Sequence, residues 1–291
     1  MRSRLLPQPS VAVAGRCRLR PDSHIVTEPD AQALTALASA TAREVGSHLL
    51  QWRRERRSIA SDTKSGPTDV VTTADLEAEA MIRERLLAAY PDAAWWGEES
   101  GRSSGSGADL EWVVDPIDGT VNFLYGLPGW AVSIAAAWRG EVVSAAVMVP
   151  TTATLFSATK GMGAWVDDDG HRSRLAVTEC ADLSQALIAT GFAYAAATRV
   201  RQGASVGRLV SEVRDIRRGG AASVDLCSVA AGRVDGYFES GLQPWDLAAG
   251  GLIAREAGAV VTERDDGSVV ASGPRLAAPL EELLADVGAW Q

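Results

Sequence analysis

Residues 112–123 read Trp-Val-Val-Asp-Pro-Ile-Asp-Gly-Thr-Val-Asn-Phe, and this stretch decides how the rest of the chain is interpreted. The apolar run before Asp115 predicts a strand that ends there, because the proline that follows cannot donate a backbone hydrogen bond and turns the chain. Asp118 and Gly119 then predict a sharp turn, and Thr120 opens a helix whose free N–H groups attract anions. The stretch therefore predicts two carboxylates beside an anion-binding helix terminus.

The two carboxylates of this stretch need a partner. Two ionised carboxylates about 5 Å apart repel each other by about 3 kcal/mol at an effective dielectric constant of about 20. Such a pair stays ionised only when a cation lies between its members, or else one member takes a proton. This pattern is typical of a metal–phosphate site, but an ordinary Asp-Gly turn has the same local sequence. The stretch alone leaves both interpretations open.

Three further segments place acids where strands or helices begin or end. They are Asp69-Val-Val-Thr-Thr-Ala-Asp75, Gly97-Glu-Glu-Ser100 and Trp245-Asp246. Taken singly, each acid is typical of a solvated side chain or a helix cap. Together they form an all-oxygen donor set without histidine or cysteine, which is the set that Mg²⁺ prefers.

The composition limits the classes of protein to consider. The chain has 291 residues, of which 46% are hydrophobic and 22% charged, and a net charge of −9. These values are typical of a globular protein of one or two domains. The acidic balance argues against a nucleic-acid partner, whose footprint is a basic face. No apolar run reaches the about 18 residues that a membrane helix needs. The three cysteines are scattered, which predicts a reducing compartment, the cytoplasm, and no structural zinc.

Hydrophobic patterns predict a mixed α/β (α+β) architecture built in layers. Helices are expected over residues 31–51, from about residue 73, and over 226–231 and 248–257; strands are expected over 112–115, 130–134, 142–149, 154–157 and 236–239. The basic residues 1–28 are interpreted as a disordered tail. Asp167-Asp-Asp-Gly170 is interpreted as a hairpin turn, because it lacks the spacing and terminal Glu of a calcium loop. The arginines over 53–57 are interpreted as a solvated face that complements the helix dipole.

The acidic segments, in this order and at these spacings, resemble the inositol monophosphatase family. The matching motifs are Lys64-x4-Asp69-Val-Val-Thr-x-Ala-Asp75, Gly97-Glu-Glu, Asp115-Pro-Ile-Asp-Gly-Thr120, Thr190-Gly-Phe-Ala-Tyr194, Arg217-Arg-Gly-Gly-Ala-Ala-Ser-Val-Asp-Leu226 and Trp245-Asp246. The resemblance covers about residues 30 to 285. It implies a layered αβαβα sandwich of the inositol monophosphatase and fructose-1,6-bisphosphatase type, as one phosphatase domain over 29–285 with halves of about 29–175 and 176–285.

The resemblance also implies a set of metal ligands. Two to three Mg²⁺ ions are expected in each active site. The first would lie on Glu98, Asp115 and the Ile117 carbonyl, and the second on Asp115, Asp118 and Asp246. Glu98 would also help to position a third, weaker ion. Bound cations would reverse the local charge of an acidic protein that otherwise repels a phosphate dianion.

Catalytic and substrate-binding residues are implied in the same way. Thr120, paired with Asp75, would orient and activate the attacking water, and Glu98 completes the implied catalytic set. The implied substrate contacts are Asp118, Gly119, Thr120, Gly220, Ala221, Ala222, Glu239 and Asp246. The family often has Ser or Thr where Ala221 stands and Ala where Ser223 stands, which leaves the exact substrate open.

The resemblance implies an inositol-1-monophosphatase that acts on a small phosphorylated polyol, as a lithium-sensitive, cytoplasmic homodimer without membrane contact. Glu239, placed like the inositol-contacting acid of the family, favours this substrate. Histidinol-phosphate phosphatase and fructose-1,6-bisphosphatase remain alternatives, because the metal site is common to all three. A regulator of the RNA or transcription machinery, a role of some relatives, is a further alternative.

Overall fold

The structure is a computed structural model that describes residues 28–56, 61–66, 69–103 and 108–290. For residues 61–66 and 69–71 it describes the backbone alone. The predicted basic tail, residues 1–28, lies outside the described residues except for its last member.

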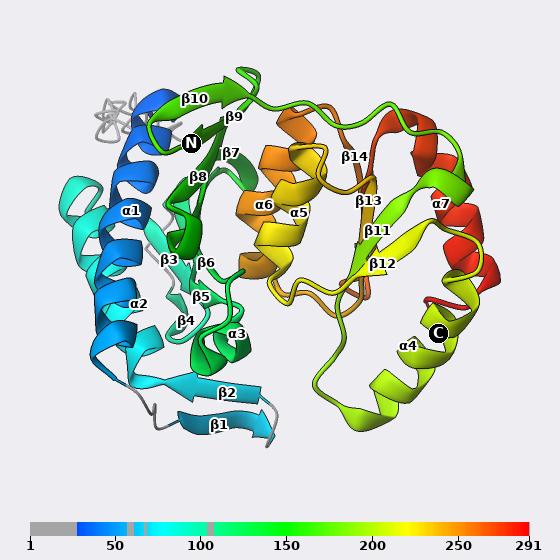
Figure 1. Cartoon of the computed structure of the whole chain (residues 1–291). Helices are drawn as coiled ribbons and strands as arrows, with labels where there is room; N and C mark the ends of the chain where they lie inside the picture. Colours follow the sequence, from blue (N-terminus) through cyan, green and yellow to red (C-terminus); the bar gives the residue numbers. More distant parts are fainter. Residues whose placement is uncertain (1–27, 57–60, 67–68, 104–107, 291) are drawn as a thin grey trace, which may run out of the picture.

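Five layers of secondary structure stack across the molecule, as Figure 1 shows. The helices of the layers are α1 (Ala31–Glu55) and α2 (Thr73–Ala89) on one outer side, α5 (Ala222–Ala230) and α6 (Pro244–Glu256) in the middle, and α4 (Ala196–Leu209) and α7 (Pro274–Asp286) on the other outer side. An eight-stranded sheet and a five-stranded sheet separate these helical layers. The predicted αβαβα sandwich is therefore confirmed.

The eight-stranded sheet has the order β10-β9-β8-β7-β6-β5-β3-β4. Its strands are β3 (Ala94–Gly97), β4 (Gly101–Ser103), β5 (Leu110–Asp118), β6 (Ala131–Trp138), β7 (Glu141–Val149), β8 (Thr154–Thr159), β9 (Ala164–Asp168) and β10 (His171–Arg174). All neighbours are antiparallel except β3 and β5. Helices cover both faces, so β5 and β6 are buried along nearly their whole length; β6 is apolar except for Ser133, whereas β5 carries Asp115 and Asp118 at its end.

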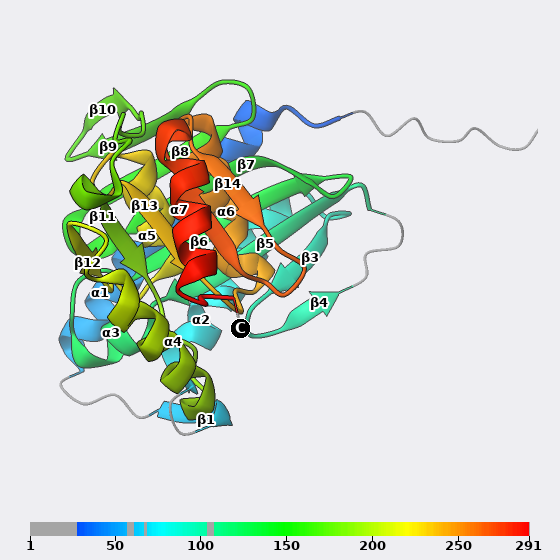
Figure 2. The ribbon, with the colours of Figure 1, turned by 90° about the vertical axis from the view of Figure 1, so that its right-hand side faces the viewer.

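The five-stranded sheet has the order β12-β11-β13-β15-β14. Its strands are β11 (Leu187–Thr190), β12 (Asp215–Arg217), β13 (Gly236–Glu239), β14 (Val260–Glu263) and β15 (Val269–Ser272). Figure 2 shows α7 in front of this sheet when the molecule is turned. A separate hairpin is formed by β1 (Ser61–Gly66) and β2 (Asp69–Thr72). The described helices include none that is long and apolar enough to cross a membrane.

The core lies on both sides of β5. Trp112 packs with Leu34, Ile82 and other residues of α1 and α2, whereas Val113 packs with Ile253 and other residues of α5 and α6. Successive side chains of a strand point to opposite faces, so adjacent residues of β5 belong to different cores. Each fully buried aliphatic side chain of this kind stabilises the fold by about 1.5–3 kcal/mol. Packing on both faces therefore fixes β5, and it also fixes the position of Asp115 and Asp118 at the end of the strand.

Arg53, near the end of α1, differs from the predicted solvated face. Its Nε donates to the Phe123 carbonyl at 3.0 Å and its Nη2 to the Leu124 carbonyl at 3.2 Å. These carbonyls belong to the end of the short helix α3 (Thr120–Tyr125). A cation there satisfies orphan carbonyls and complements the helix dipole. Arg53 therefore fixes the helix that follows the acidic turn.

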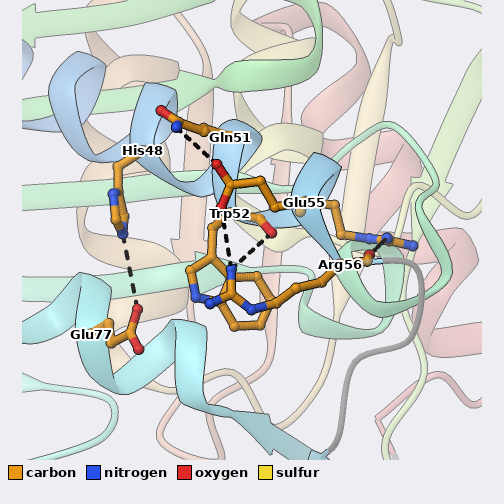
Figure 3. A network of polar contacts seen from close by, with 7 residues as sticks. His48, Gln51, Trp52, Glu55, Arg56 and Glu77 are labelled. Carbon is orange, nitrogen blue, oxygen red and sulfur yellow. Dashed lines mark hydrogen bonds and ion pairs between the residues drawn. The ribbon is translucent and has the colours of Figure 1, made fainter.

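The neighbouring arginine keeps to the surface, as predicted. The Arg56 guanidinium lies 4.1 Å from the centre of the Trp52 ring, and the His48 imidazole lies 4.0 Å from the Glu77 carboxylate on α2 (Figure 3). Exposed pairs of this kind contribute little to stability. These contacts therefore lie on the surface of the outer helical layer, which α1 and α2 form.

Candidate active site

The acidic turn lies at the carboxyl end of β5. The prediction that the strand ends at Asp115 is wrong, because β5 continues to Asp118 with an irregular register against β6 between these two residues. An irregularity of this kind bends a strand and re-aims its side chains, and it accommodates Pro116. Asp115 and Asp118 are only 2% and 7% exposed. Both carboxylates therefore lie inside the protein, at one end of one strand.

Gly119 connects the strand to α3, which begins at Thr120 as predicted. Its φ of 90° is in the left-handed region, which glycine adopts without strain. A Cβ at this position would lie 3.1 Å from both the Gly220 carbonyl oxygen and the Ala221 Cβ. The glycine thus permits the turn and also the close approach of the segment over residues 220–222.

Thr120 and Asp75 are brought together from separate elements, as the resemblance implies. The Thr120 hydroxyl lies 3.4 Å from Asp75 Oδ1 and 3.1 Å from the Ile117 carbonyl oxygen. Asp75 Oδ2 accepts from the Thr72 amide at 2.8 Å and from the Thr72 hydroxyl at 2.6 Å, which completes a capping box at the start of α2. The Asp75 carboxylate therefore caps a helix with one oxygen and faces Thr120 with the other.

Four carboxylates converge at this place: Glu98 beyond β3, Asp115 and Asp118 on β5, and Asp246 on α6. Burial raises the pKa of Asp115 well above its usual range, and Glu98, Asp118 and Asp246 raise it further in that order. The Glu98 and Asp115 carboxyls share a hydrogen bond. Burial also raises the pKa of Asp246 well above its usual range, with Asp118 as the next contributor. The four predicted acidic ligands are thus electrostatic neighbours, of which Asp115 and Asp118 are buried and Glu98 and Asp246 half-buried.

Asp118 is held by the start of α5. Its Oδ1 accepts from the Ala222 amide at 3.2 Å, and its Oδ2 accepts from the Ser223 amide at 2.7 Å and the Ser223 hydroxyl at 2.6 Å. Burial raises the pKa of Asp118 to about 6, and these hydrogen bonds oppose that rise. The contact of Ser223 with Asp118 was not predicted from the sequence; the hydroxyl of Ser223, where the family often has Ala, was the available signal.

Asp246 belongs to the start of α6, where its Oδ2 accepts from the Gln243 amide at 2.7 Å. Its neighbour Trp245 meets Trp96 edge to face, with ring centres 6.4 Å apart. Because Trp96 is two residues from Glu98, this aromatic pair joins the chain segments that carry two of the carboxylates. Helix α6 of the middle layer thereby contacts strand β3 of the eight-stranded sheet beside the site.

The donor set fits a hard divalent cation. In the part of the chain that the structure describes, no three His, Cys, Asp or Glu side chains form a ready-made metal cluster. The converging donors are nonetheless carboxylates and a backbone carbonyl, the ligands that Mg²⁺ prefers. A cation among buried like-charged carboxylates would stabilise their ionised forms. The chemistry of the residues therefore agrees with the predicted metal, and their roles as ligands stay a prediction.

The predicted substrate contacts of the C-terminal half lie at residues 220–222 and at Glu239. The Asn122 amide donates to the Gly129 carbonyl at 2.8 Å and to the Gly219 carbonyl at 2.9 Å, which ties the segment before Gly220 to the acidic turn. Asn122 is buried and both of its N–H donors are used. This bridge was not predicted from the sequence, although Asn122 lies within residues 112–123.

Glu239 is the last residue of β13. Its Oε2 accepts from the Tyr237 hydroxyl at 2.7 Å. Burial raises the pKa of Glu239 to about 7, whereas the bond from Tyr237 lowers it. The pKa of Asp225 is raised to about 8, by burial first and by Glu239 next. The C-terminal half therefore holds two neighbouring acids with raised pKa values. The side chains of Lys64 and Asp69, from the first motif, lie outside the described residues.

The sequence and the fold are both similar to those of known proteins. The sequence model of the Inositol monophosphatase family matches residues 30–288. Inositol-1-monophosphatase SuhB of Mycobacterium tuberculosis is 46% identical over 232 residues, covering 76% of this chain and 79% of the relative. Nus factor SuhB of Vibrio cholerae is 41% identical over 250 residues, covering 82% of this chain and 91% of the relative. The solved structure of Mycobacterium tuberculosis SuhB superposes with a TM-score of 0.80 at 39% identity, covering 91% of this chain and all of that chain.

Proposed function

Because the chain belongs to the inositol monophosphatase family, whose members are phosphoric monoester hydrolases, we propose that it hydrolyses a small phosphorylated polyol and that its preferred substrate is inositol 1-phosphate. The observation that carries this proposal is the convergence of four carboxylates, the buried Asp115 and Asp118 and the half-buried Glu98 and Asp246, together with the Thr120–Asp75 pair. A buried group of acids is costly for folding alone and is typical of a functional site.

The family is generally metal-dependent, and we propose Mg²⁺ as the metal, with two to three ions per site. Glu98, Asp115 and the Ile117 carbonyl would hold the first ion, and Asp115, Asp118 and Asp246 the second. When bound, the cations would neutralise the phosphate dianion, lower the pKa of water and stabilise the leaving oxygen. The fixed position of Asp118 against α5 supports its role as a ligand. Lithium inhibition is part of this proposal.

The residues of the chain would orient the reactants. The Thr120 hydroxyl, placed between the Asp75 carboxylate and the Ile117 carbonyl, would accept a hydrogen bond from the attacking water while it donates to Asp75. This arrangement favours one direction for the water lone pair and gives its proton a path toward a carboxylate. The Gly119 and Thr120 amides, at the start of α3, would bind phosphate oxygens.

The substrate wall would be formed by Glu239 and the backbone of residues 220–222. A carboxylate accepts hydrogen bonds from adjacent ring hydroxyls, which suits a polyol. Ala221 offers no hydroxyl, so this wall would select through backbone groups and Glu239. Asn122, which ties Gly219 to the acidic turn, would keep the wall at a constant distance from the reacting phosphate.

The test is phosphate release from myo-inositol 1-phosphate, histidinol phosphate and fructose 1,6-bisphosphate, with Mg²⁺ and with chelator. We expect a preference of at least about tenfold in kcat/KM for inositol phosphate, about 1.4 kcal/mol in the transition state. A preference for histidinol phosphate would support the proposed hydrolysis of a phosphate monoester but would contradict inositol 1-phosphate as the preferred substrate. Absence of Mg²⁺-dependent release from all three would overturn the proposal.

A second candidate function rests on the name that several relatives carry. The Vibrio cholerae protein that is 41% identical is named a Nus factor, and this name points to transcription. RNA binding by the Asp118→Asn variant that weakens steeply with salt would support this role, since contacts to phosphate release counterions. The net charge of −9 works against it. No salt-dependent binding at physiological ionic strength would exclude direct RNA contact.

The proposed assembly is a homodimer in the cytoplasm. Tyr125 at the end of α3 and Leu127 in the loop after it are 77% and 51% exposed, which is apolar area that a second copy could cover. Of the described cysteines, Cys180 and Cys227 are free thiols, as a reducing compartment favours. Sedimentation should give a species of twice 30.6 kDa, and Tyr125→Glu should shift it toward the monomer. A single 30.6 kDa species at micromolar concentration would overturn the dimer.

A further inference from the structure

Helix α2 presents two buried carboxylates on one face. Asp75 and Glu79 are four residues apart, so they lie one above the other on the helix. Both belong to the buried polar residues of the protein. Asp75 faces Thr120, as described above, whereas Glu79 points to the turn that follows Glu98. One helix face therefore supports two separate parts of the site.

Glu79 binds the backbone of that turn with both oxygens. Its Oε2 accepts from the Glu99 amide at 2.8 Å and its Oε1 from the Ser100 amide at 2.9 Å. Bonds from an N–H group to a carboxylate are roughly twice as strong as neutral ones. The two amides belong to the two residues directly after Glu98, so the backbone that leaves Glu98 is fixed by α2.

The remaining contacts of the turn agree with a fixed position. A Cβ on Gly97 would lie 2.6 Å from Glu79 Oε1, so only glycine lets the carboxylate approach this closely. The Glu98 amide donates to the Val114 carbonyl of β5 at 3.1 Å, and Trp95 Nε1 donates to the Ser100 hydroxyl at 2.9 Å. Together with Glu79, these bonds hold the segment from both sides.

We propose that Glu79 is a positioning residue for Glu98: it fixes the backbone over 98–100 so that the Glu98 carboxylate meets Asp115. This inference rests on the proposed function, because it takes Glu98 as a metal ligand. Glu79 acts through the backbone amides and touches neither substrate nor metal. Its loss should therefore weaken metal binding more than it slows the reaction of the metal-loaded enzyme.

The chain contains a matched control for this chemistry. Glu256, at the end of α6, accepts from the Gly161 amide at 2.7 Å and from the Gly163 amide at 2.8 Å. It too is a helix carboxylate that holds a turn through two backbone amides, here the turn between β8 and β9. That turn carries no predicted site residue. Glu256→Gln therefore reports the structural cost of the same substitution away from the site.

The experiment compares Mg²⁺ binding by calorimetry in the wild type, Glu79→Gln and Glu256→Gln. Glutamine has the same size as glutamate, but it offers one acceptor oxygen and turns an NH₂ group toward an amide. We expect Glu79→Gln to raise the Mg²⁺ dissociation constant by at least about tenfold, the usual effect of losing a partner behind a ligand. The kcat at saturating Mg²⁺ should stay within about threefold of the wild type on the same grounds. Glu256→Gln should leave Mg²⁺ binding unchanged.

Hydrogen exchange gives an independent readout. The amides of Glu99 and Ser100 should exchange faster in Glu79→Gln and stay protected in Glu256→Gln. Should Glu79→Gln fail to fold, Glu79→Asp keeps the charge, draws it back by one methylene and should show a smaller change of the same direction. Equal Mg²⁺ dissociation constants in the wild type and both variants, with the wild type active, would overturn this inference alone. A wild type that neither binds Mg²⁺ nor hydrolyses a monoester would overturn the proposed function and this inference with it.

Discussion

Two turns of this chain both end in Asp-Gly and carry further acids, but their surroundings are opposite. Asp115-Pro-Ile-Asp-Gly119 ends β5, and Asp167-Asp-Asp-Gly170 joins β9 to β10. The first turn is buried and meets carboxylates from two other segments. The second is a hairpin tip at the edge of the sheet, where Asp169 and Gly170 have φ values of 48° and 80°. The tip is the predicted hairpin turn, which is thereby confirmed.

The difference shows that acid density by itself does not make a site. At the tip, Asp167 pairs with Arg43 at 2.7 Å and accepts from the Gly170 amide, while Asp168 and Asp169 are exposed to water. Water solvates Asp168 and Asp169, and the Arg43 guanidinium neutralises Asp167, so these charges need no metal ion. At the end of β5, burial raises the pKa values of Asp115 and Asp118. A bound cation is the partner that would lower them again.

The largest difference between the two turns should appear when an aspartate of each is replaced by asparagine. Asp118→Asn removes the charge of a proposed metal ligand, and we expect kcat to fall at least about 10⁴-fold because the metal contribution amounts to several kcal/mol. Asp169→Asn at the hairpin tip should leave kcat unchanged, since asparagine tolerates the same left-handed backbone. Phosphate release at saturating Mg²⁺ measures both. Near-normal turnover of Asp118→Asn would remove the distinction between the two turns.

The next contrast lies within the first turn. Thr120→Ala removes the hydroxyl that is proposed to orient water, and kcat should fall about 10²- to 10³-fold, the range for a positioned proton acceptor. Mg²⁺ binding by calorimetry should change little, because Asp115 and Asp118 stay in place. Thr120→Ser keeps the hydroxyl and should recover most of the rate. A loss confined to Mg²⁺ affinity would contradict the water-orienting role.

Buried and exposed acids should also differ in the pH dependence of stability. The pKa of Glu239 is raised from 4.5 to about 7, so the folded protein keeps this proton where the unfolded chain has lost it. Stability should therefore fall as pH rises between these values, by up to about 3 kcal/mol from this group. Glu239→Gln should flatten the fall seen in urea unfolding from pH 5 to 8. Asp169→Asn should leave the slope as in the wild type, and an unchanged slope in Glu239→Gln would refute the assignment.

The smallest contrast concerns the two glycines. Gly119 and Gly170 both have positive φ, so alanine at either position costs about 1 kcal/mol or more in backbone strain. A Cβ at Gly170 meets nothing within 4 Å, whereas one at Gly119 meets the Gly220 carbonyl oxygen at 3.1 Å. Gly119→Ala should therefore destabilise the protein by about 1–2 kcal/mol more than Gly170→Ala. Equal midpoints in urea would show that the wall over 220–222 yields freely.

Much of the fold was accessible from local patterns. The helix that starts near residue 73, the helix that starts at Thr120 and the hairpin tip were predicted from neighbouring residues, and the structure confirms them. The errors concern distant partners. The end of β5 depends on its pairing with β6, and the role of Arg53 depends on carbonyls 70 and 71 residues away. Local sequence holds no signal for such contacts.

The candidate site divides in the same way. The residue types and their order were readable, because oxygen donors at fixed spacings are a chemical signature in themselves. The hydrogen bonds that hold these donors in place could not be predicted in this way, because they join distant residues. Ser223 lies 105 residues from Asp118, and Glu99 lies 20 residues from Glu79. The roles of the donors as metal ligands stay predictions until Mg²⁺ binding is measured.

The amino-acid sequence by itself determined which groups could do the chemistry: the carboxylates, the hydroxyl of Thr120 and the glycine that permits the turn. Only the tertiary structure decided that Asp115 and Asp118 are buried and Asp168 and Asp169 exposed. The physical reason is that a charge responds to what surrounds it in space. Here the surroundings are provided by α5, α6 and β3, which the packing of two sheets against a shared helical layer brings to the end of β5.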